Sequence, residues 1–345
     1  MTKQIWTLAV SAVLFMLCAA LIIMLPVPYV TWLPGGTYDL LATDTPDDPI
    51  QVGGVDTYPT SGQLRMTTVS VTSSGRQLSL PEVVAAYWLP SREVLPRQSI
   101  YPAGVSTEQI SAQDLQRMSS SKSDAAVAAL RAANIPVEEY PMVTAVAPSG
   151  PSLEVLIVGD LIAMIDDTPT PSVQSVVEAV SDHHVGDAVV VTVLRSGITL
   201  KKTVTTRASA KQADEPILGV TLGLGHLYGP SIRFGINADI GGSSAGLTMA
   251  LAIYAKLSPT DLLSDRVVAG TGTIDSDGNV GAIGGVQEKI AAAERDQATI
   301  FLLPEANCVD AGKQAGIRLV PVSSLREAIT ALETLKDPTK EVKGC

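Results

Sequence analysis

The segment Gly-Gly-Ser-Ser-Ala-Gly, residues 241–246, places two hydroxyl groups between glycines just before an apolar run. From Leu247 to Leu257, apolar side chains recur at helical spacing, which predicts a buried helix whose N-terminus lies at Ser244. A helix N-terminus offers unpaired N–H groups and a positive partial charge, and both suit a developing oxyanion. The segment therefore predicts a serine nucleophile presented by a turn. The alternative is that Ser243 or Ser244 is only a helix N-cap.

A serine nucleophile needs a base within reach, and the same part of the chain offers few. His226, with Asp239 to orient it, is one alternative, as part of a Ser/His/Asp arrangement. Lys256 lies 12 residues further along the predicted helix. At 1.5 Å per residue its Cα is about 18 Å from that of Ser244, so it cannot reach.

Lys289 is the remaining base, in the first turn of a second predicted helix among apolar residues. Burial and the positive end of the helix dipole both lower the pKa of a lysine at that position, and its neutral amine can then accept the serine proton. The alternative is an exposed lysine paired with Glu288 or Glu294.

The composition excludes several function classes. The chain has 345 residues, enough for two or three domains, and a net charge of −11 without a Lys/Arg cluster, which argues against nucleic acid as a partner. It lacks the G-x-x-x-x-G-K-[ST] pattern, so we expect no ATP binding. We expect no cofactor and no metal site. The histidines are too few for one, and the cysteines, Cys18, Cys308 and Cys345, show neither a disulfide framework nor a paired metal motif.

The clearest physical signal is an uncharged run of 21 residues from Ile5 to Leu25, long enough to cross a bilayer as a helix of roughly 30 Å. Lys3 precedes the run, and the next basic residue is Arg65. The positive-inside rule then predicts a cytoplasmic N-terminus and an extracytoplasmic remainder. A signal peptide is the alternative. Because no small-x-small cleavage site follows at residues 26–28, we favour an uncleaved anchor in the cell membrane.

Residues 29–136 predict a small β-rich N-terminal region without chemistry of its own. The segments Leu64–Val71 and Leu78–Leu80 indicate short strands separated by Ser-Gly turns. The alanine-rich stretch Ser121–Ala133 indicates a helix capped by residues 121–123.

Residues 137–208 show a strand at Met142–Ala147, a Pro/Gly turn, the sequence Gly159-Asp160-Leu161-Ile162, a helix at Val173–Val180 and a strand at Ala188–Arg195. This order resembles a PDZ domain of the bacterial type, which implies binding of an extended peptide beside one helix. The Gly-Leu-Gly-Phe type signature is absent before Met142. Acidic residues nearby would repel a C-terminal carboxylate. The alternative is a PDZ-like fold used only as a spacer.

A linker at residues 209–215 leads to residues 216–337, where predicted strands alternate with helices in an α/β or α+β domain, followed by a tail at 338–345. Three segments there, 242–246, 269–274 and 278–289, are similar to the proteolytic domain of Lon proteases. The resemblance implies that Ser244 is the nucleophile and Lys289 the general base of a Ser-Lys dyad. It also implies that Thr271 hydrogen-bonds the lysine.

The same resemblance makes the turn residues Gly242, Ser243 and Ala245 supporting members of the site. Ser243 departs from the pattern, because Lon proteases usually have proline there. That substitution leaves a second candidate hydroxyl beside Ser244.

The order of segments predicts a multidomain protein: a cytoplasmic tip and transmembrane helix (1–28), the β-rich region, the PDZ-like domain and the Lon-type domain. It resembles the membrane-anchored Lon-like PDZ proteases of Gram-positive bacteria, the YlbL-type family. The resemblance implies an ATP-independent serine endopeptidase that cleaves unstructured extracytoplasmic peptides or protein segments, docked by the PDZ-like domain. It also implies a homo-oligomeric ring. The alternative is a non-catalytic membrane-tethered scaffold with a degenerate Lon-like domain.

Overall fold

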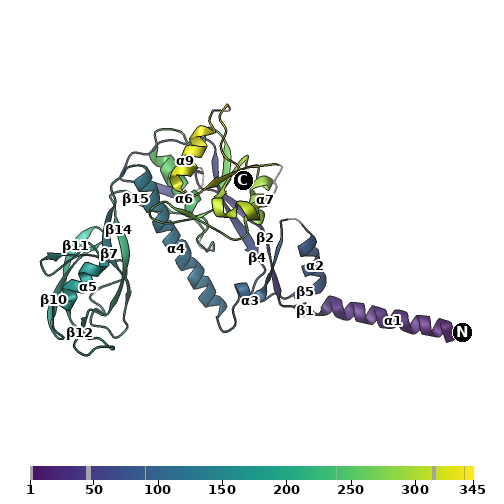
Figure 1. Cartoon of the computed structure of the whole chain (residues 1–345), viewed down its shortest axis with the longest axis horizontal. Helices are drawn as coiled ribbons and strands as arrows, with labels where there is room; N and C mark the ends of the chain where they lie inside the picture. The colour runs from purple at the N-terminus through teal and green to yellow at the C-terminus, as the bar shows by residue number, and fades with distance from the viewer. Residues whose placement is uncertain (1–2, 44–47, 90, 238, 313–315, 338) are drawn as a thin grey trace. The chain divides into compact units, whose positions relative to one another are not determined.

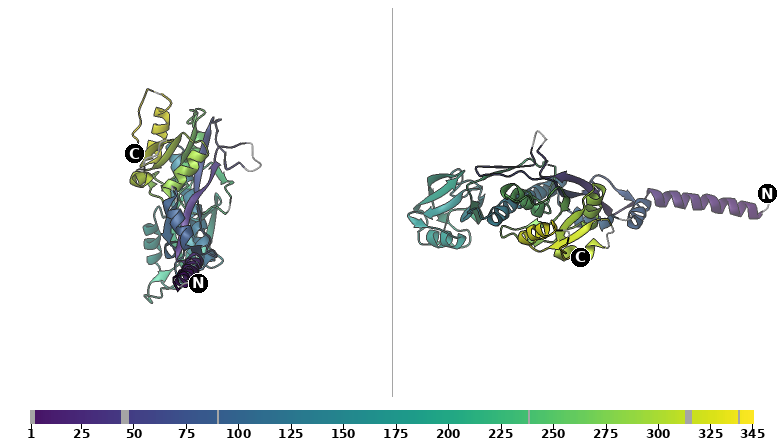
Figure 2. Two further views of the ribbon diagram at one scale, coloured as in Figure 1. Left: turned by 90° about the vertical axis from the view of Figure 1, so that its right-hand side faces the viewer. Right: turned by 90° about the horizontal axis from the view of Figure 1, so that it is seen from above.

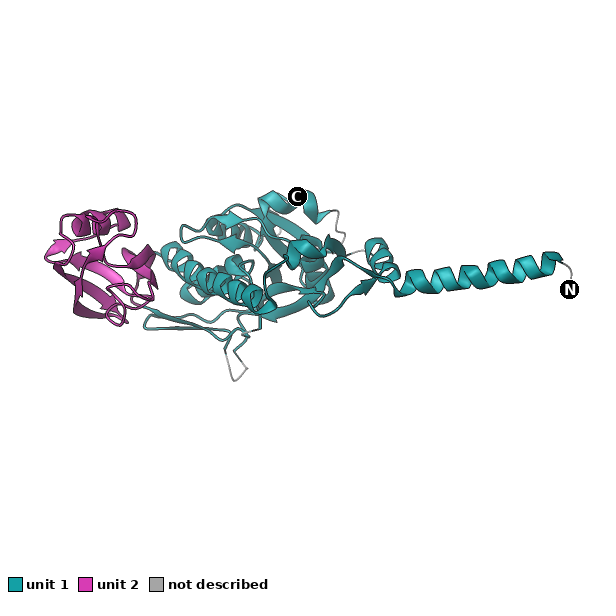
Figure 3. Cartoon of the chain, turned by 90° about the horizontal axis from the view of Figure 1, so that it is seen from below, with its two compact units in different colours: residues 1–134, 230–345 teal, residues 135–229 magenta. Residues whose placement is uncertain are grey.

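The chain divides into two compact units (Figures 1 and 3). The computed structural model describes residues 3–43, 48–89, 91–237, 239–312, 316–337 and 339–345. Unit 1 comprises residues 1–134 and 230–345, and unit 2 comprises residues 135–229. Unit 2 is therefore an insertion between the two halves of unit 1.

Helix α1 (Lys3–Met24) is a single uninterrupted helix (Figure 2) with mean hydropathy 2.6 in its most apolar window. Its length and apolar composition are sufficient to cross a membrane, but an N-terminal signal sequence can have the same length and composition. None of its residues is buried within the protein.

The core of unit 1 is a six-stranded sheet in the order β20-β19-β16-β4-β2-β6. Strands β4, β16, β19 and β20 run parallel, and β2 pairs antiparallel with β4 and β6. The strands are β2 (Tyr29–Asp39), β4 (Gln63–Val71), β6 (Glu93–Pro96), β16 (Val267–Gly270), β19 (Ile300–Pro304) and β20 (Arg318–Val322).

This sheet corrects the expected separation of residues 29–136 from the Lon-type domain. Strand β16 is buried, so its backbone needs hydrogen-bond partners on both edges. Strand β19 supplies one edge and β4, from the N-terminal half, supplies the other. The N-terminal strands complete the sheet of the C-terminal half instead of forming a region of their own.

Three short two-stranded pairings also belong to unit 1. These are β1 (Pro26–Val27) with β5 (Leu78–Ser79), β3 (Ile50–Gly53) with β15 (Ser231–Phe234), and β17 (Thr273–Ile274) with β18 (Val280–Gly281).

The long helix α4 (Thr107–Ala132) packs on the buried helix α6 (Gly246–Leu257). It begins fourteen residues before the predicted start at Ser121, because Ser106 caps it by accepting a hydrogen bond from the Gln109 amide. Its N-terminal turns are polar and largely exposed, so no apolar pattern marks them. The other helices of unit 1 are α2 (Leu80–Trp88), α3 (Arg97–Ile100), α7 (Val286–Arg295), the 3₁₀ turn Glu305–Asn307, α8 (Cys308–Ala311) and α9 (Leu325–Thr334).

Unit 2 is a sheet in the order β11-β10-β8-β7-β14, with helix α5 (Val173–Ser181) packed on it. Its core includes Val143, Ile162, Val189 and Val191. The strands are β7 (Glu138–Val146), β8 (Leu161–Ile165), β9 (Thr168–Pro169), β10 (Ala188–Arg195), β11 (Ile198–Thr205), β12 (Arg207–Ala208), β13 (Pro216–Ile217) and β14 (Val220–Leu227).

The boundary expected at residue 216 differs from the observed one. Strand β14 pairs antiparallel along β7, from Val220 opposite Val146 to Leu227 opposite Glu138. It therefore belongs to unit 2, which ends at Gly229, and not to the domain that follows.

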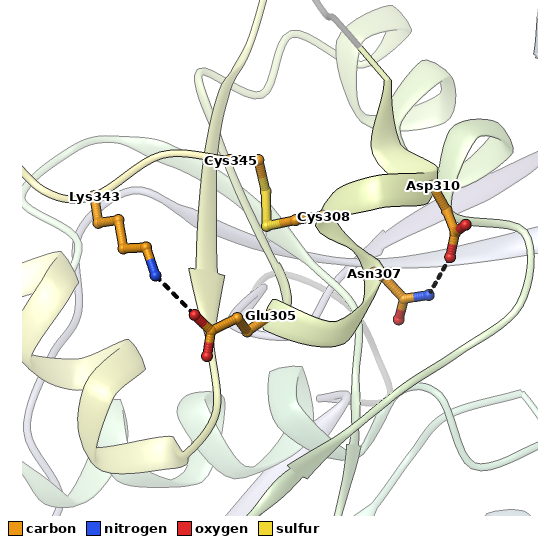
Figure 4. The surroundings of a disulfide bond; sticks show 6 residues. All are labelled: Glu305, Asn307, Cys308, Asp310, Lys343 and Cys345. Atoms are coloured by element: carbon orange, nitrogen blue, oxygen red, sulfur yellow. Dashed lines mark hydrogen bonds and ion pairs between the residues drawn. A yellow bond between two sulfur atoms is a disulfide. The ribbon is translucent and has the colours of Figure 1, made fainter.

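Cys308 and Cys345 form a disulfide (Figure 4), with their Cα atoms 5.3 Å apart. The positions of the cysteines in the sequence do not predict this pairing. The two residues are 37 positions apart, and they meet because β20 and α9 lead the chain away and back. Beside the disulfide, the Lys343 ammonium contacts the Glu305 carboxylate at 2.7 Å. Disulfides persist in oxidising compartments.

We expect Cys345→Ser to lower the free energy of unfolding by about 3–4 kcal/mol, because it releases a closed loop of the unfolded chain. The measurement is denaturant unfolding of the full-length protein without reductant. Cys308→Ser should match it, while Cys18→Ser, which alters the exposed free cysteine, should leave the midpoint unchanged. Identical midpoints for wild type and Cys345→Ser would contradict the pairing.

Candidate active site

Two flanking segments hold the turn at residues 242–245 in place. On one side, the Gly242 amide donates to the Asp114 carbonyl at 3.0 Å and the Ser121 hydroxyl donates to the Ser243 carbonyl at 3.1 Å. On the other side, the Gly272 amide donates to the Ser244 carbonyl at 2.8 Å. Gly242 has φ +91°, a backbone conformation that favours glycine. The turn is therefore held from one side by helix α4 and from the other by the connection between β16 and β17.

The start of α6 fits closely against its neighbours. A Cβ atom at Gly246 would lie 2.8 Å from the Ile274 side chain and 2.9 Å from the Ser121 hydroxyl. Ala245 is the N-cap residue, and its carbonyl accepts a hydrogen bond from the Thr248 hydroxyl at 2.9 Å. The small residues in this segment thus allow the start of α6 to approach helix α4 and strand β17.

Helix α7 brings Lys289 into the protein interior. The helix begins after Gly285, which has φ +68° and lies against the Trp32 and Val69 side chains of β2 and β4. Lys289 is only 2% exposed. The alternative of an exposed first-turn lysine is therefore wrong.

The side chains of the three residues that the sequence predicts for the site, Ser244, Lys289 and Thr271, contact one another. The Lys289 Nζ donates to the Ser244 Oγ at 2.8 Å and to the Thr271 Oγ1 at 3.1 Å. The Thr271 hydroxyl, which is fully buried, donates to the Ser244 carbonyl at 3.0 Å. Thr271 thus contacts both the lysine amine and the backbone that carries the serine.

Burial lowers the pKa of Lys289 from 10.5 to about 8, and the negative charge of Glu288 opposes part of that shift. Glu288 is itself buried, which raises its pKa, and the nearby Glu93 adds to the increase. Near pH 8, a large share of the Lys289 amine is neutral and can accept a proton.

A cavity of about 290 Å³ opens at Ser244 and Lys289. Its walls include Met66, Val69 and Met118, from β4 and α4. These apolar walls come from the N-terminal half of the chain, where the sequence indicates no chemistry. No local signal marks them, because Met66 and Val69 reach the cavity through the pairing of β4 with β16, and Met118 through the packing of α4 on α6.

The other candidate bases, and the carboxylate expected to orient His226, are described residues that lie elsewhere in the structure or form no hydrogen bond with the Ser244 hydroxyl. His226 lies on β14 in unit 2. Asp239 lines the cavity at Ser244, and Lys256 is in the last turn of α6. Among the described residues, the side-chain amine that contacts the Ser244 hydroxyl is that of Lys289.

Comparison with known proteins identifies two domains. Residues 237–331 match the Lon protease (S16) C-terminal proteolytic domain, and residues 113–206 match the PDZ domain. The archaeal Lon protease of Methanocaldococcus jannaschii is 41% identical over 92 residues, which cover 27% of this chain and 14% of that protein. Lon protease 2 of Bacillus subtilis is 33% identical over 146 residues, covering 41% and 26%.

A solved structure similar to part of the chain is the PDZ domain of the SdrC-like protein from Listeria monocytogenes. It is 27% identical, covers 24% of this chain and 86% of that one, and has a TM-score of 0.23.

The chain thus carries a proteolytic domain of the Lon class, which is a serine peptidase class, together with a PDZ domain. The combination of a Lon-type proteolytic domain with a PDZ domain, and the multidomain fold class, are confirmed as the sequence predicts. The matched segments span a quarter or less of the length of most curated Lon relatives, such as 14% and 13% for the first two.

We expect phosphonylation of Ser244 by a serine-reactive phosphonate probe to rise with pH with a midpoint near 8, because the Lys289 amine accepts a proton only in its neutral form. Glu288→Gln should move the midpoint to lower pH, since it removes a negative charge that favours the ammonium form. Glu294→Gln, on the same helix, is the matched control and should leave the midpoint in place. A midpoint that stays near 10 in all three proteins would contradict this account.

Thr271→Val should slow labelling of Ser244 about 10–100-fold, because the hydrogen bonds of the Thr271 hydroxyl to the Lys289 amine and the Ser244 carbonyl are lost. Thr271→Ser keeps the hydroxyl and should restore most of the rate. Equal rates for the valine and serine variants would show that the hydroxyl does not orient Lys289. The measurement is the rate of probe labelling, with thermal unfolding as the stability control.

Proposed function

We propose that this protein is a membrane-anchored, ATP-independent serine endopeptidase in which Ser244 is the nucleophile and Lys289 the general base. The observation that carries the proposal is the 2.8 Å contact between the Lys289 Nζ and the Ser244 Oγ, made by an almost fully buried lysine. A buried amine of lowered pKa is a proton acceptor at neutral to mildly alkaline pH.

In the proposed reaction, the Ser244 Oγ attacks the carbonyl carbon of a peptide bond while its proton passes to the neutral Lys289 Nζ. The tetrahedral intermediate collapses, the Lys289 ammonium returns that proton to the leaving amine, and an ester to Ser244 remains. A water molecule then attacks the ester, again with Lys289 as the base, and releases the carboxylic acid and the Ser244 hydroxyl. Thr271 holds the amine in position throughout.

The oxyanion would be stabilised at the start of α6. The amide N–H groups of Ser244 and Ala245 donate no hydrogen bond to any described residue, so they are available to a ligand. The Gly242 amide is already committed to the Asp114 carbonyl. The positive end of the α6 dipole adds to the stabilisation of negative charge at this point.

Location outside the cytoplasm is supported by two independent features. Helix α1 is long and apolar enough to span a membrane, with Lys3 at its start. The disulfide between Cys308 and Cys345 fits an oxidising compartment. Because the sequence contains no phosphate-binding loop, we propose that the substrate is an unstructured segment that needs no ATP-driven unfolding.

Unit 2 has a groove suited to a peptide. A cavity of about 280 Å³ lies between α5 and the segment from Glu215 to Leu222, and its walls include Val176, Val180 and Leu218. The segment Ile217-Leu218-Gly219-Val220 leads into β14, beside the helix. We propose that it takes the place of the Gly-Leu-Gly-Phe type loop that is absent before Met142. We propose that this groove docks substrates. Assembly into a ring stays a prediction from the resemblance.

The test is a comparison of peptides released into the membrane and medium by cells carrying wild type, Ser244→Ala or Ser243→Ala. Ser244→Ala should abolish a set of cleavages, and Ser243→Ala should keep them. Lys289→Met should lower the rate about 10²–10⁴-fold, the usual contribution of a general base. If Ser244→Ala still produced every wild-type cleavage, Ser244 would not be the nucleophile. If cells without the protein also produced them, the protein would instead be the non-catalytic scaffold.

A further inference from the structure

Helix α2 exposes one strongly apolar face. Leu80, Val84, Tyr87 and Trp88 are 41%, 48%, 78% and 80% exposed. Their positions follow the spacing i, i+4, i+7 and i+8, which puts them on one side of the helix. Ala86, on a different face, is buried. The apolar side of α2 is therefore turned away from the body of unit 1.

Backbone pairing ties this helix to the end of α1. Helix α1 ends at Met24, and β1 follows immediately, pairing Pro26 with Ser79 and Val27 with Leu78. Ser79 is the N-cap of α2. Helices α1 and α2 are in contact (Figure 1). The exposed face of α2 is thus continuous with the outer end of the helix that can span a membrane.

The side chains on and around α2 suit a lipid surface. Tyrosine and tryptophan are enriched where a bilayer meets water, because their rings are apolar and their N–H or O–H groups can reach the headgroups. The only acidic residue of α2, Glu82, is paired with the Arg76 guanidinium at 2.8 Å and accepts a hydrogen bond from the Ser79 amide. No uncompensated negative charge of the helix therefore opposes contact with lipid.

We propose that α2 lies in the outer interface of the membrane, with Val84, Tyr87 and Trp88 inserted among the lipids, as a second attachment beside α1. The proposal rests on the membrane anchoring proposed above. Two attachments would hold the outer end of α1 and the first strands of unit 1 at a defined height over the bilayer, whereas a single helix would leave them free to swing.

Trp88 can report on its own surroundings by fluorescence. The chain has only two other tryptophans, Trp6 and Trp32, whose emission must be removed or subtracted. Full-length Trp6→Phe protein is reconstituted into phosphatidylcholine vesicles, and the spectrum of Trp6→Phe/Trp88→Phe is subtracted to isolate the Trp88 emission. Lipids brominated near the headgroup should quench that emission about twofold or more, and lipids brominated near the chain ends should quench it less, as expected for an interfacial helix.

The matched control is Val309→Trp in the Trp6→Phe/Trp88→Phe background. Val309 is 92% exposed and lies on α8, so its tryptophan should stay unquenched. Protein that floats with the vesicles but leaves Trp88 unquenched would overturn the role of α2 and leave the anchor standing. Protein that does not float with vesicles would overturn the anchor as well. Unquenched but blue-shifted Trp88 would mean that a protein surface, not lipid, covers this face.

Discussion

The chemistry proposed for this protein depends on one buried amine. Lys289 is held in the interior, within hydrogen-bond distance of the Ser244 and Thr271 hydroxyls, without a carboxylate in direct contact to hold its proton among the described residues. Desolvation makes the charged form costly and leaves a base ready near neutral pH. The free energy of that burial must be offset by packing elsewhere in the fold, of which the mixed six-stranded sheet is the core.

The sheet also explains why the two halves of the chain cannot be separated. Strand β4 hydrogen-bonds to β16, whose end leads to Thr271, and β2 and β4 form the surface on which α7 packs. Helix α4 supplies Ser121 and Asp114 to the turn before Ser244. Ser244 and Lys289 are each positioned by segments on both sides of the PDZ insertion, which makes the proteolytic unit depend on N-terminal residues outside the segment that matches the Lon proteolytic domain.

Local patterns predicted much of the molecule. Three features are marked by local sequence patterns and lie where the sequence indicated. They are the apolar run after Ser244, the glycines around residue 285 and the order of the strands Met142–Ala147 and Ala188–Arg195 around the helix of unit 2. Most of the errors involve distant pairing. The partnership of β4 with β16, the place of β14 beside β7 and the disulfide of Cys308 with Cys345 join residues far apart along the chain, and nothing in a local window reports such contacts. The start of α4 was missed for a different reason, because its first turns are polar and exposed and carry no apolar pattern.

The most direct test of the central claim is the titration of Lys289 itself. Full-length protein with ¹³C at the lysine ε-carbons gives one NMR signal per lysine, and Lys289→Met identifies the signal that belongs to this residue. The account predicts that this signal titrates near pH 8. A midpoint near 10.5, the ordinary value for lysine, would contradict the claim that burial prepares Lys289 as the base for Ser244.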